Sequence, residues 1–466
     1  MKHLFLCVLI ISALFLAACG GGSGSSSVTG GSVSTAPSGT VYVTGSDAPL
    51  PSVLAFQITI NSMALSNATT SVPVISEPTS VEFSRLLGLR TLLALNSVPA
   101  GTYNKVSVTF ASPVISYLDI NTSPASVGII NGTLANSTIN LNLPQPLTVG
   151  ENGLGGMHFH INLRDSLGVD SVSGELTGTV DPKIQMRPLT VNDDDAEIDE
   201  LRGGLSSVDV AHNSFVIQRF RGRDVTIRVD SNTSWDGTDN INTLSLPAII
   251  EVSGKVQADG SVLADQVQVI TRDRSFVAGL VLGAQPPVGS ADSFSILVRE
   301  EMPVIPGVDV GKPATLTIGT PTRFDIYTMR LPVETFLFNR SQLVVGQRVS
   351  VGGVADTSTT PATFTTRRVV LHRQGMDGVY SPNSLVVTAG NTGEFRLVEN
   401  GFFGYLFGAP VRVITSPATR FINLTGLSDV ANSGNSPIFV VGLLLKDDNG
   451  NPVLVAGKVG KSNTAN

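Results

Sequence analysis

Short runs in which apolar and polar residues alternate recur along this chain of 466 residues. Four of them lie in its first third: "TVYVTG" (40–45), "FQITINSMAL" (56–65), "KVSVTF" (105–110) and "TINLNL" (138–143). A period of two places alternate side chains on opposite faces of a strand, so each run predicts a half-buried strand. Because such signals dominate, we predict an all-β protein.

One segment has helical spacing instead. In "SRLLGLRTLLAL" (84–95), leucines recur three and four residues apart. Ser84 is a suitable N-cap and Asn96 a suitable stop. We therefore predict one short helix across the end of a sheet, followed by the turn "PAGTY" (99–103) and further strands.

The chain begins like an export signal. Lys2 precedes an apolar segment from Leu4 to Leu16, which is 13 residues long. A membrane-spanning helix needs roughly 20 residues, so this length fits a signal peptide better. Residues 1–18, ending at Ala18, are predicted to be that signal peptide.

Leu16-Ala17-Ala18-Cys19 resembles the lipobox of bacterial lipoproteins. The resemblance implies cleavage between Ala18 and Cys19 and lipidation of Cys19, which would anchor the protein to a membrane. Residues 19–39 then form the lipidated cysteine and a tether of mainly Gly, Ser and Thr, a composition that does not fold. The expected location is the cell envelope, and the outer membrane if the source is Gram-negative, because Gly20 replaces the aspartate typical of inner-membrane retention.

Only two cysteines occur in the chain, Cys7 and Cys19. Cleavage would remove the first and lipidation would occupy the second. The exported protein is therefore expected to lack disulfides and a catalytic thiol, and to depend on its hydrophobic core for stability.

Charged residues make up 14% of the chain, and the net charge is −7 without any basic block. A protein that binds nucleic acid needs a concentrated positive surface, so nucleic acid is excluded as a predicted partner.

Residues 40–190 are predicted to form the first folded domain. Its "SDAP" (46–49), "VEFSRLLGL" (81–89) and "VPAGTYNKVSVTF" (98–110) resemble the bacterial lipoprotein family known as domain of unknown function 4382. The resemblance implies a β-sandwich and carries no established activity.

An acidic segment, "VNDDDAEIDELRGG" (191–204), follows this domain. Its carboxylates have some resemblance to a calcium-binding loop, but that loop needs glycine at its sixth position and glutamate at its twelfth. Here those positions hold Ile198 and Gly204. We therefore predict a solvated acidic linker.

The remainder divides into three similar units, at 205–275, 276–375 and 376–466. Each contains a threonine shortly before an aromatic residue, then a strand with a glycine, then a valine-rich strand. The threonine segments are "VDSNTSW" (229–235), "IGTPTRF" (318–324) and "ITSPATRF" (414–421). The pattern resembles domain of unknown function 5666 and implies about three small OB-like β-barrel or sandwich repeats. The third unit fits least well, because its Gly442 comes late.

The stretch "GMHFHINLRD" (156–165) is the strongest candidate for metal chemistry. His158 and His160 are two residues apart on a predicted strand, so both point to one face and form a possible metal pair, with Asp165 or a distant carboxylate as a possible third ligand. The alternation also predicts that their three apolar neighbours point inward. Both histidines would then lie on the solvent face.

Aromatic residues provide the other candidates for ligand contact. "GFFGYLFG" (401–408) contains Phe402, Phe403 and Tyr405, and Trp235 is the only tryptophan. Exposed aromatic side chains stack on sugar rings or contact other proteins. The alternative, which we favour for the first group, is a strand whose aromatic side chains fill the third barrel.

No nucleophile elbow and no phosphate-binding loop occurs in the sequence, so we predict a protein that is not an enzyme and has no cofactor. The leading prediction is a lipid-anchored envelope protein with a binding, adhesion or structural role, whose partner is a glycan or an envelope protein. Two alternatives stay open: a carbohydrate-binding protein of a polysaccharide system, and a metal-dependent hydrolase that uses His158 and His160.

Overall fold

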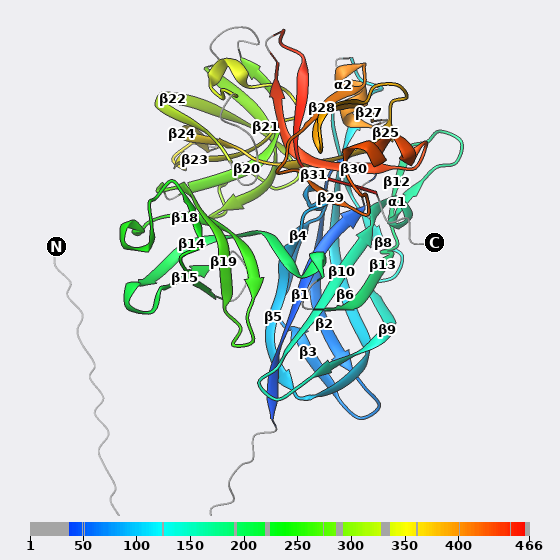
Figure 1. Cartoon of the computed structure of the whole chain (residues 1–466), viewed down its shortest axis with the longest axis vertical. Helices are drawn as coiled ribbons and strands as arrows, with labels where there is room; N and C mark the ends of the chain where they lie inside the picture. The colour runs from blue at the N-terminus through cyan, green and yellow to red at the C-terminus, as the bar shows by residue number, and fades with distance from the viewer. Residues whose placement is uncertain are drawn as a thin grey trace, which may run out of the picture. The chain divides into compact units, whose positions relative to one another are not determined.

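The computed structural model describes residues 37–461, apart from positions 49, 51, 124, 191–192, 220–223, 274, 286–291, 328–335, 360–361, 400 and 448. The predicted signal peptide, with Ala18, and the predicted lipidation site at Cys19 lie outside the described residues. Within them, strands far outnumber the short helices, so the all-β prediction is confirmed (Figure 1). No helix in this described part is long and apolar enough to span a membrane.

The first domain is a β-sandwich, as predicted. Its core contains Phe56, Phe83, Phe110 and Phe159, all fully buried between two sheets. One sheet contains β1 (Ser38–Ala48), β5 (Thr91–Pro99), β10 (Leu154–Asn162) and β13 (Ile184–Leu189). The other contains β2 (Val53–Ser66), β3 (Ser71–Ile75), β4 (Thr79–Glu82), β6 (Gly101–Asp119), β7 (Ser126–Asn131) and β9 (Thr138–Val149). A small third sheet contains β8 (Thr133–Leu134), β11 (Leu167–Val169) and β12 (Leu176–Val180). The one-turn helix α1 (Leu163–Ser166) directly precedes β11.

The helix predicted over 84–95 is wrong. Only a 3-10 turn forms, from Ser84 to Leu86, and the rest of the segment enters strand β5. Neighbouring leucines pack into different cores: Leu92 joins the core of the first barrel, whereas Leu93 joins the sandwich core. Because both faces of this strand are buried, its apolar residues follow one another without the two-residue period that marks a half-buried strand.

The turn at 99–103 is stabilised by its own tyrosine. Tyr103 is buried, and its hydroxyl donates a hydrogen bond to the carbonyl oxygen of Pro99 at 2.7 Å. The phenol therefore ties the end of β5 to the start of β6 and satisfies its own polar atom inside the core.

The three predicted repeats each form a closed barrel of five strands, and the strands pair in the same circular order: first, second, third, fifth, fourth, first. In every barrel the third and fifth strands are parallel. Barrel 1 contains β14 (Glu197–Asp209), β15 (Ser214–Gln218), β16 (Val225–Arg228), β18 (Ile249–Val256) and β19 (Val262–Thr271), with β17 (Ser234–Asp236) at its edge. Barrel 2 contains β20 (Ser275–Gln285), β21 (Ser293–Met302), β22 (Pro313–Ile326), β23 (Arg348–Asp356) and β24 (Thr363–Leu371). Barrel 3 contains β25 (Gln374–Tyr380), β27 (Thr392–Val398), β28 (Val411–Thr415), β30 (Ile438–Lys446) and β31 (Pro452–Lys461), with β26 (Val386–Ala389), β29 (Arg420–Ile422) and helix α2 (Phe402–Phe407) added.

The glycine of each repeat marks a bulge in the fourth strand. Gly254, Gly353 and Gly442 each lie beside a register shift. A Cβ atom at any of them would collide with a carbonyl oxygen of the fifth strand. Gly442 therefore occupies the same structural position as Gly254 and Gly353, although it comes later in the sequence of its unit.

The repeated threonine binds this same part of the fifth strand. The hydroxyls of Thr233, Thr322 and Thr419 donate to the carbonyl oxygens of Ala264, Thr366 and Ala456 at 2.8, 2.9 and 2.7 Å. The aromatic residue two positions later packs against the core of its own barrel. The repeated threonine and aromatic residue thus fix their segment to the fifth strand and to the core of each barrel.

The acidic segment at 191–204 is not a solvated linker. From Glu197 onward it belongs to β14, the first strand of barrel 1, and its carboxylates are buried. A single parallel pair, Glu200 with Thr91 of β5, joins this strand to the sandwich sheet. The prediction failed because the charges of this segment have partners distant in sequence.

Candidate functional site

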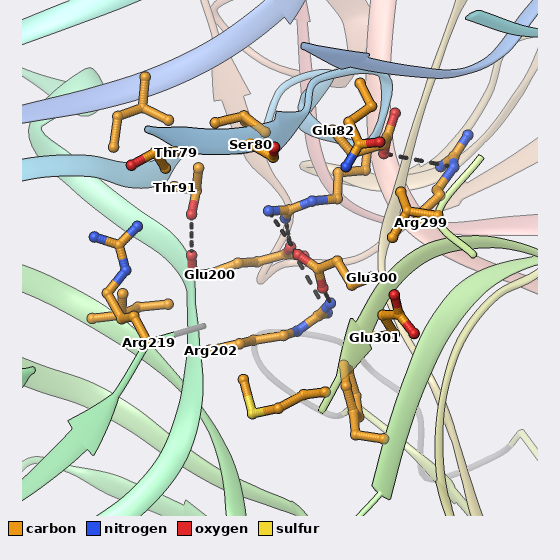
Figure 2. A pocket seen from close by; sticks show the side chains of 18 of the residues that line it. Thr79, Ser80, Glu82, Thr91, Glu200, Arg202, Arg219, Arg299, Glu300 and Glu301 are labelled. Atoms are coloured by element: carbon orange, nitrogen blue, oxygen red, sulfur yellow. Dashed lines mark hydrogen bonds and ion pairs between the residues drawn. The ribbon is translucent and has the colours of Figure 1, made fainter. Parts of the chain in front are cut away.

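The junction of the sandwich with barrels 1 and 2 encloses a cavity of about 390 Å³ (Figure 2). Strands β4 and β5 contribute one side of its lining, and β14, β20 and β21 the other. Ligand sites typically occupy 300–1,000 Å³ and lie between domains, and this cavity meets both criteria.

A bulge in β14 directs two carboxylates toward the sandwich. The pairing of β14 with β18 shifts register between Ile198 and Leu201. The amides of Asp199 and Glu200 both donate to the Arg90 carbonyl oxygen, at 2.9 and 3.1 Å. The bulge therefore replaces ladder bonds of barrel 1 with bonds to the sandwich.

Glu200 is the centre of a buried group of arginines. Arg348 of barrel 2 donates to both of its carboxylate oxygens, each at 2.6 Å, and Arg85 of the sandwich donates to one at 2.9 Å. Burial alone would raise the pKa of Glu200, but the arginines, Arg348 foremost, outweigh it and hold the pKa well below its ordinary value.

Glu300 of barrel 2 extends this group along the cavity wall. It pairs with Arg85 at 2.8 Å and also with Arg202, which bonds to Glu251 in turn. Burial raises the pKa of Glu300, yet the nearby arginines bring it below its ordinary value. Glu200 and Glu300, two of the glutamates that line the cavity, are thus held ionised.

A second buried group ties barrel 3 to the same bulge. Asp199 lies 3.5 Å from Lys458 of β31 and 3.6 Å from Arg90. Glu197 bonds to Arg420 of β29 at 2.8 Å. Strand β14 therefore holds ion pairs with the sandwich and with both other barrels, which fixes the geometry of the cavity.

Asp47, the aspartate of the predicted "SDAP" motif, is buried beside these groups and neither of its carboxylate oxygens accepts a hydrogen bond in the described structure. Burial, followed by the charges of Glu82 and Asp377, raises its pKa well above its ordinary value. The motif therefore supplies a carboxyl group that favours its protonated form.

The variant Asp47→Asn tests this state. A raised folded-state pKa means that the folded protein binds the proton more tightly than the unfolded chain, so stability is lost as pH rises above about 4. We expect Asp47→Asn to raise the free energy of unfolding at pH 7.5 by at least about 1 kcal/mol, with a smaller gain at pH 4. Urea titrations at both values measure it, and a gain that does not depend on pH would contradict the assignment.

Asp170→Asn is the matched comparison. This exposed turn carboxylate accepts hydrogen bonds from the Ser173 and Val172 amides, which lower its pKa. The contribution of Asp170 to folding stability is present at neutral pH and is lost as the pH falls through its lowered folded-state pKa. The stability change of Asp170→Asn is therefore expected to depend on pH with the opposite sign to that of Asp47→Asn.

The two histidines of β10 lie close together but not on a solvent face. Their apolar neighbours point into the sandwich core, as predicted. The opposite face is covered, and His158 is buried with its ring nitrogens 3.1 Å from the Thr44 hydroxyl and 2.9 Å from that of Ser46. Burial lowers the pKa of His158 to about 4, so the ring is neutral.

The proposed third metal ligand is elsewhere. Asp165 accepts a hydrogen bond from the Asn162 side chain at the start of α1. The carboxylate nearest to His158 is Asp195, at 3.9 Å, and it also pairs with Arg90 and Arg187. Among the described residues, no group of three or more His, Cys, Asp or Glu is arranged to hold a metal ion.

The aromatic candidates have mainly structural contacts. Phe402–Phe407 form helix α2 and not the predicted strand. Phe402 is buried against Leu54 and Leu280, and Phe403 packs nearby, whereas Tyr405 is 55% exposed. Trp235 is the aromatic residue of its repeat and packs against the core of barrel 1. Of these candidates, Tyr405 has the most accessible side chain.

Sequence reasoning missed the cavity residues. Arg85, Glu200 and Arg299 are far apart in the chain, and no local spacing relates them. One signal was present: Glu200 lies between the apolar residues Ile198 and Leu201, whereas a solvated linker is polar throughout.

The fold and the cavity together define a class: a multidomain all-β protein with repeated five-stranded barrels packed on a sandwich. A family model described as "Domain of unknown function (DUF5666)" matches residues 202–268, which cover most of barrel 1. The first repeat therefore has a family match, and the other two barrels share its strand order. No curated protein matches the chain.

Proposed function

We propose that this protein is a lipid-anchored binding protein of the cell envelope, without catalytic activity, and that the cavity at the sandwich–barrel junction is its binding site. The preformed cavity carries this proposal. Its charged walls are held by ion pairs within the protein, and a preorganised site loses little conformational entropy on binding.

Glu200 and Glu300, two of the four glutamates that line the cavity, are poorly suited to act as the proton-donating acid of a glycosidase. A glycosidase needs one carboxyl group with a raised pKa to protonate the leaving group. Glu200 and Glu300 both have lowered pKa values and are bonded to arginines. They are suited to hold their partners in position.

The role of the cavity as the binding site can be tested by blocking its opening with a larger side chain. Val304 lines it and is 52% exposed, so a tryptophan there has room to fold over the opening. Full-length protein in detergent is incubated with the small-molecule fraction of an envelope digest, and retained compounds are identified by mass spectrometry. We expect the wild type to retain compounds that Val304→Trp does not.

Leu337→Trp is the matched control. Leu337 is 76% exposed and is not part of the cavity lining, so this variant is expected to retain the same compounds as the wild type. If all three proteins retain the same set, or none retains any, the cavity is not the binding site and the proposal fails.

The anchor has its own test. Replacing Cys19 with serine removes the thiol that would carry the lipid, so we expect Cys19→Ser to move the protein from the membrane to the soluble fraction and to abolish palmitate labelling. Fractionation with radiolabelled palmitate measures both. Protein that stays in the membrane and is unlabelled in both forms would refute the lipobox interpretation.

A further inference from the structure

Arg219 lines two adjoining hollows. It borders the cavity of about 390 Å³ and also a groove of about 280 Å³, and Thr79 and Leu93 line both as well. The groove continues along β5 of the sandwich and past barrel 1. A ligand longer than one ring therefore has space on both sides of this arginine.

Among the described residues no carboxylate forms an ion pair with Arg219, although Glu77, Asp224 and Asp259 line the same groove. Arg219 makes one hydrogen bond to the described residues, from Nη2 to the carbonyl oxygen of Leu92, at 2.6 Å. Figure 2 shows its guanidinium apart from the interactions that join Arg85 and Arg202 to the glutamates. Burial, and then the charge of Arg85, lower its pKa to about 10, which indicates an environment that lacks a counter-charge.

A bound carboxylate would supply that counter-charge. The planar guanidinium has five N–H donors, and one hydrogen bond to Leu92 leaves enough of them for a bidentate pair. Such a pair inside a half-buried site is stronger than on an open surface, because solvent screens it less.

The cavity lining also contains the carboxylates Glu82, Glu301 and Asp309, so a single carboxylate can be held only at the arginine, and the neutral part of the lining fits hydroxyl groups. Gln57, Thr79 and Ser80 present amide and hydroxyl groups to the cavity. The exposed carboxylates Glu77 and Asp224 border the groove as hydrogen-bond acceptors, and they also disfavour a ligand with many negative charges. Sugar hydroxyls, which both donate and accept, suit this mixture better than an apolar acid does.

From these features we infer that the site binds a saccharide with an isolated carboxylate, a uronate residue within an otherwise neutral sugar, and that Arg219 holds the carboxylate. This inference rests on the proposed function of the cavity as a binding site and names its ligand class.

Calorimetry with full-length protein in detergent tests the ligand class. The probes are galacturonate, galactose, acetate and inorganic phosphate. We expect galacturonate to bind about 10-fold or more tightly than galactose, because a hydrogen bond to a charged group contributes more than a neutral one. Acetate and phosphate are expected to bind more weakly than galacturonate, since neither offers the sugar hydroxyls.

Arg219→Gln is expected to weaken galacturonate binding about 10-fold or more while leaving galactose binding unchanged, and Arg219→Lys should restore part of the affinity. Arg272→Gln is the matched control: it removes an exposed arginine that bonds to Ser245 outside both hollows. Its affinities should equal those of the wild type.

Three outcomes would overturn the inference. Equal affinity of the wild type and Arg219→Gln for galacturonate would show that Arg219 does not hold the carboxylate. Phosphate that binds as tightly as galacturonate identifies a simple anion site. Absence of galacturonate binding, while Val304→Trp still abolishes retention of envelope compounds, rejects the uronate class and leaves the proposed function intact.

Discussion

Replacing Glu200 with glutamine should lower the free energy of unfolding by about 3–5 kcal/mol, since removal of one partner from a buried ion pair leaves the other charge uncompensated. Here Arg348 of barrel 2 loses its carboxylate partner, and Arg85 of the sandwich loses one of its two and keeps Glu300. Both are buried, with side chains 3% and 9% exposed, so water does not replace the lost carboxylate. Urea unfolding monitored by the fluorescence of Trp235, the single tryptophan, measures the loss next to the altered strand.

The same substitution at Glu394 is the control. Glu394 pairs with Arg412, and both side chains are about a third exposed. Ion pairs in contact with solvent contribute about 0–1 kcal/mol, so Glu394→Gln should unfold nearly as the wild type does. Equal losses in the two variants would show that Glu200 does not hold the domains together.

The second large effect is expected at the bulge glycine of barrel 1. In Gly254→Ala the new Cβ atom would collide with the Leu263 carbonyl oxygen on β19, and neither backbone can move without breaking the barrel closure. We expect a loss of about 2–4 kcal/mol, above the range of an ordinary surface substitution. Urea unfolding followed by Trp235 fluorescence again measures it.

Gly204→Ala provides the comparison within the same barrel. A Cβ atom at Gly204 meets nothing within 4 Å. Its conformational entropy in the unfolded chain falls on substitution, so the variant should lie within about 1 kcal/mol of the wild type and on the stable side. A Gly254→Ala protein as stable as Gly204→Ala would mean that the bulge tolerates a side chain, contrary to the backbone geometry.

The elements that the sequence predicted well share one property: their apolar and polar residues alternate, even in β1, which is buried on both faces. Strands β1, β2, β6 and β9 coincide with the four alternating runs. The segments that the sequence predicted badly have both faces in contact with other parts of the protein. Strand β5 is buried on both sides, and β14 carries carboxylates that point at other domains. Local periodicity cannot represent such contacts, because the second face is supplied by residues elsewhere in the chain.

The histidines illustrate the same limit. Alternation placed the apolar neighbours of His158 and His160 correctly in the core. It also implied that the other face met water, whereas the segment around Asp195 covers it. The alternation of apolar and polar residues separates the two faces of a strand, but it does not show whether water or protein covers the polar face.

The sequence by itself determined the all-β class and the three repeated units, because these follow from short-range periodicity and from a threonine and a glycine that recur in each unit, whereas the sandwich and the OB-like form were expected from resemblance to known families. Only the tertiary structure decided where the charges gather. The cavity is lined by Arg85, Glu200 and Arg219, which belong to three different stretches of the chain, and Arg348 from a fourth stretch holds Glu200 in place. Attraction between such charges depends on their separation in space and on burial, and neither quantity is encoded in local spacing.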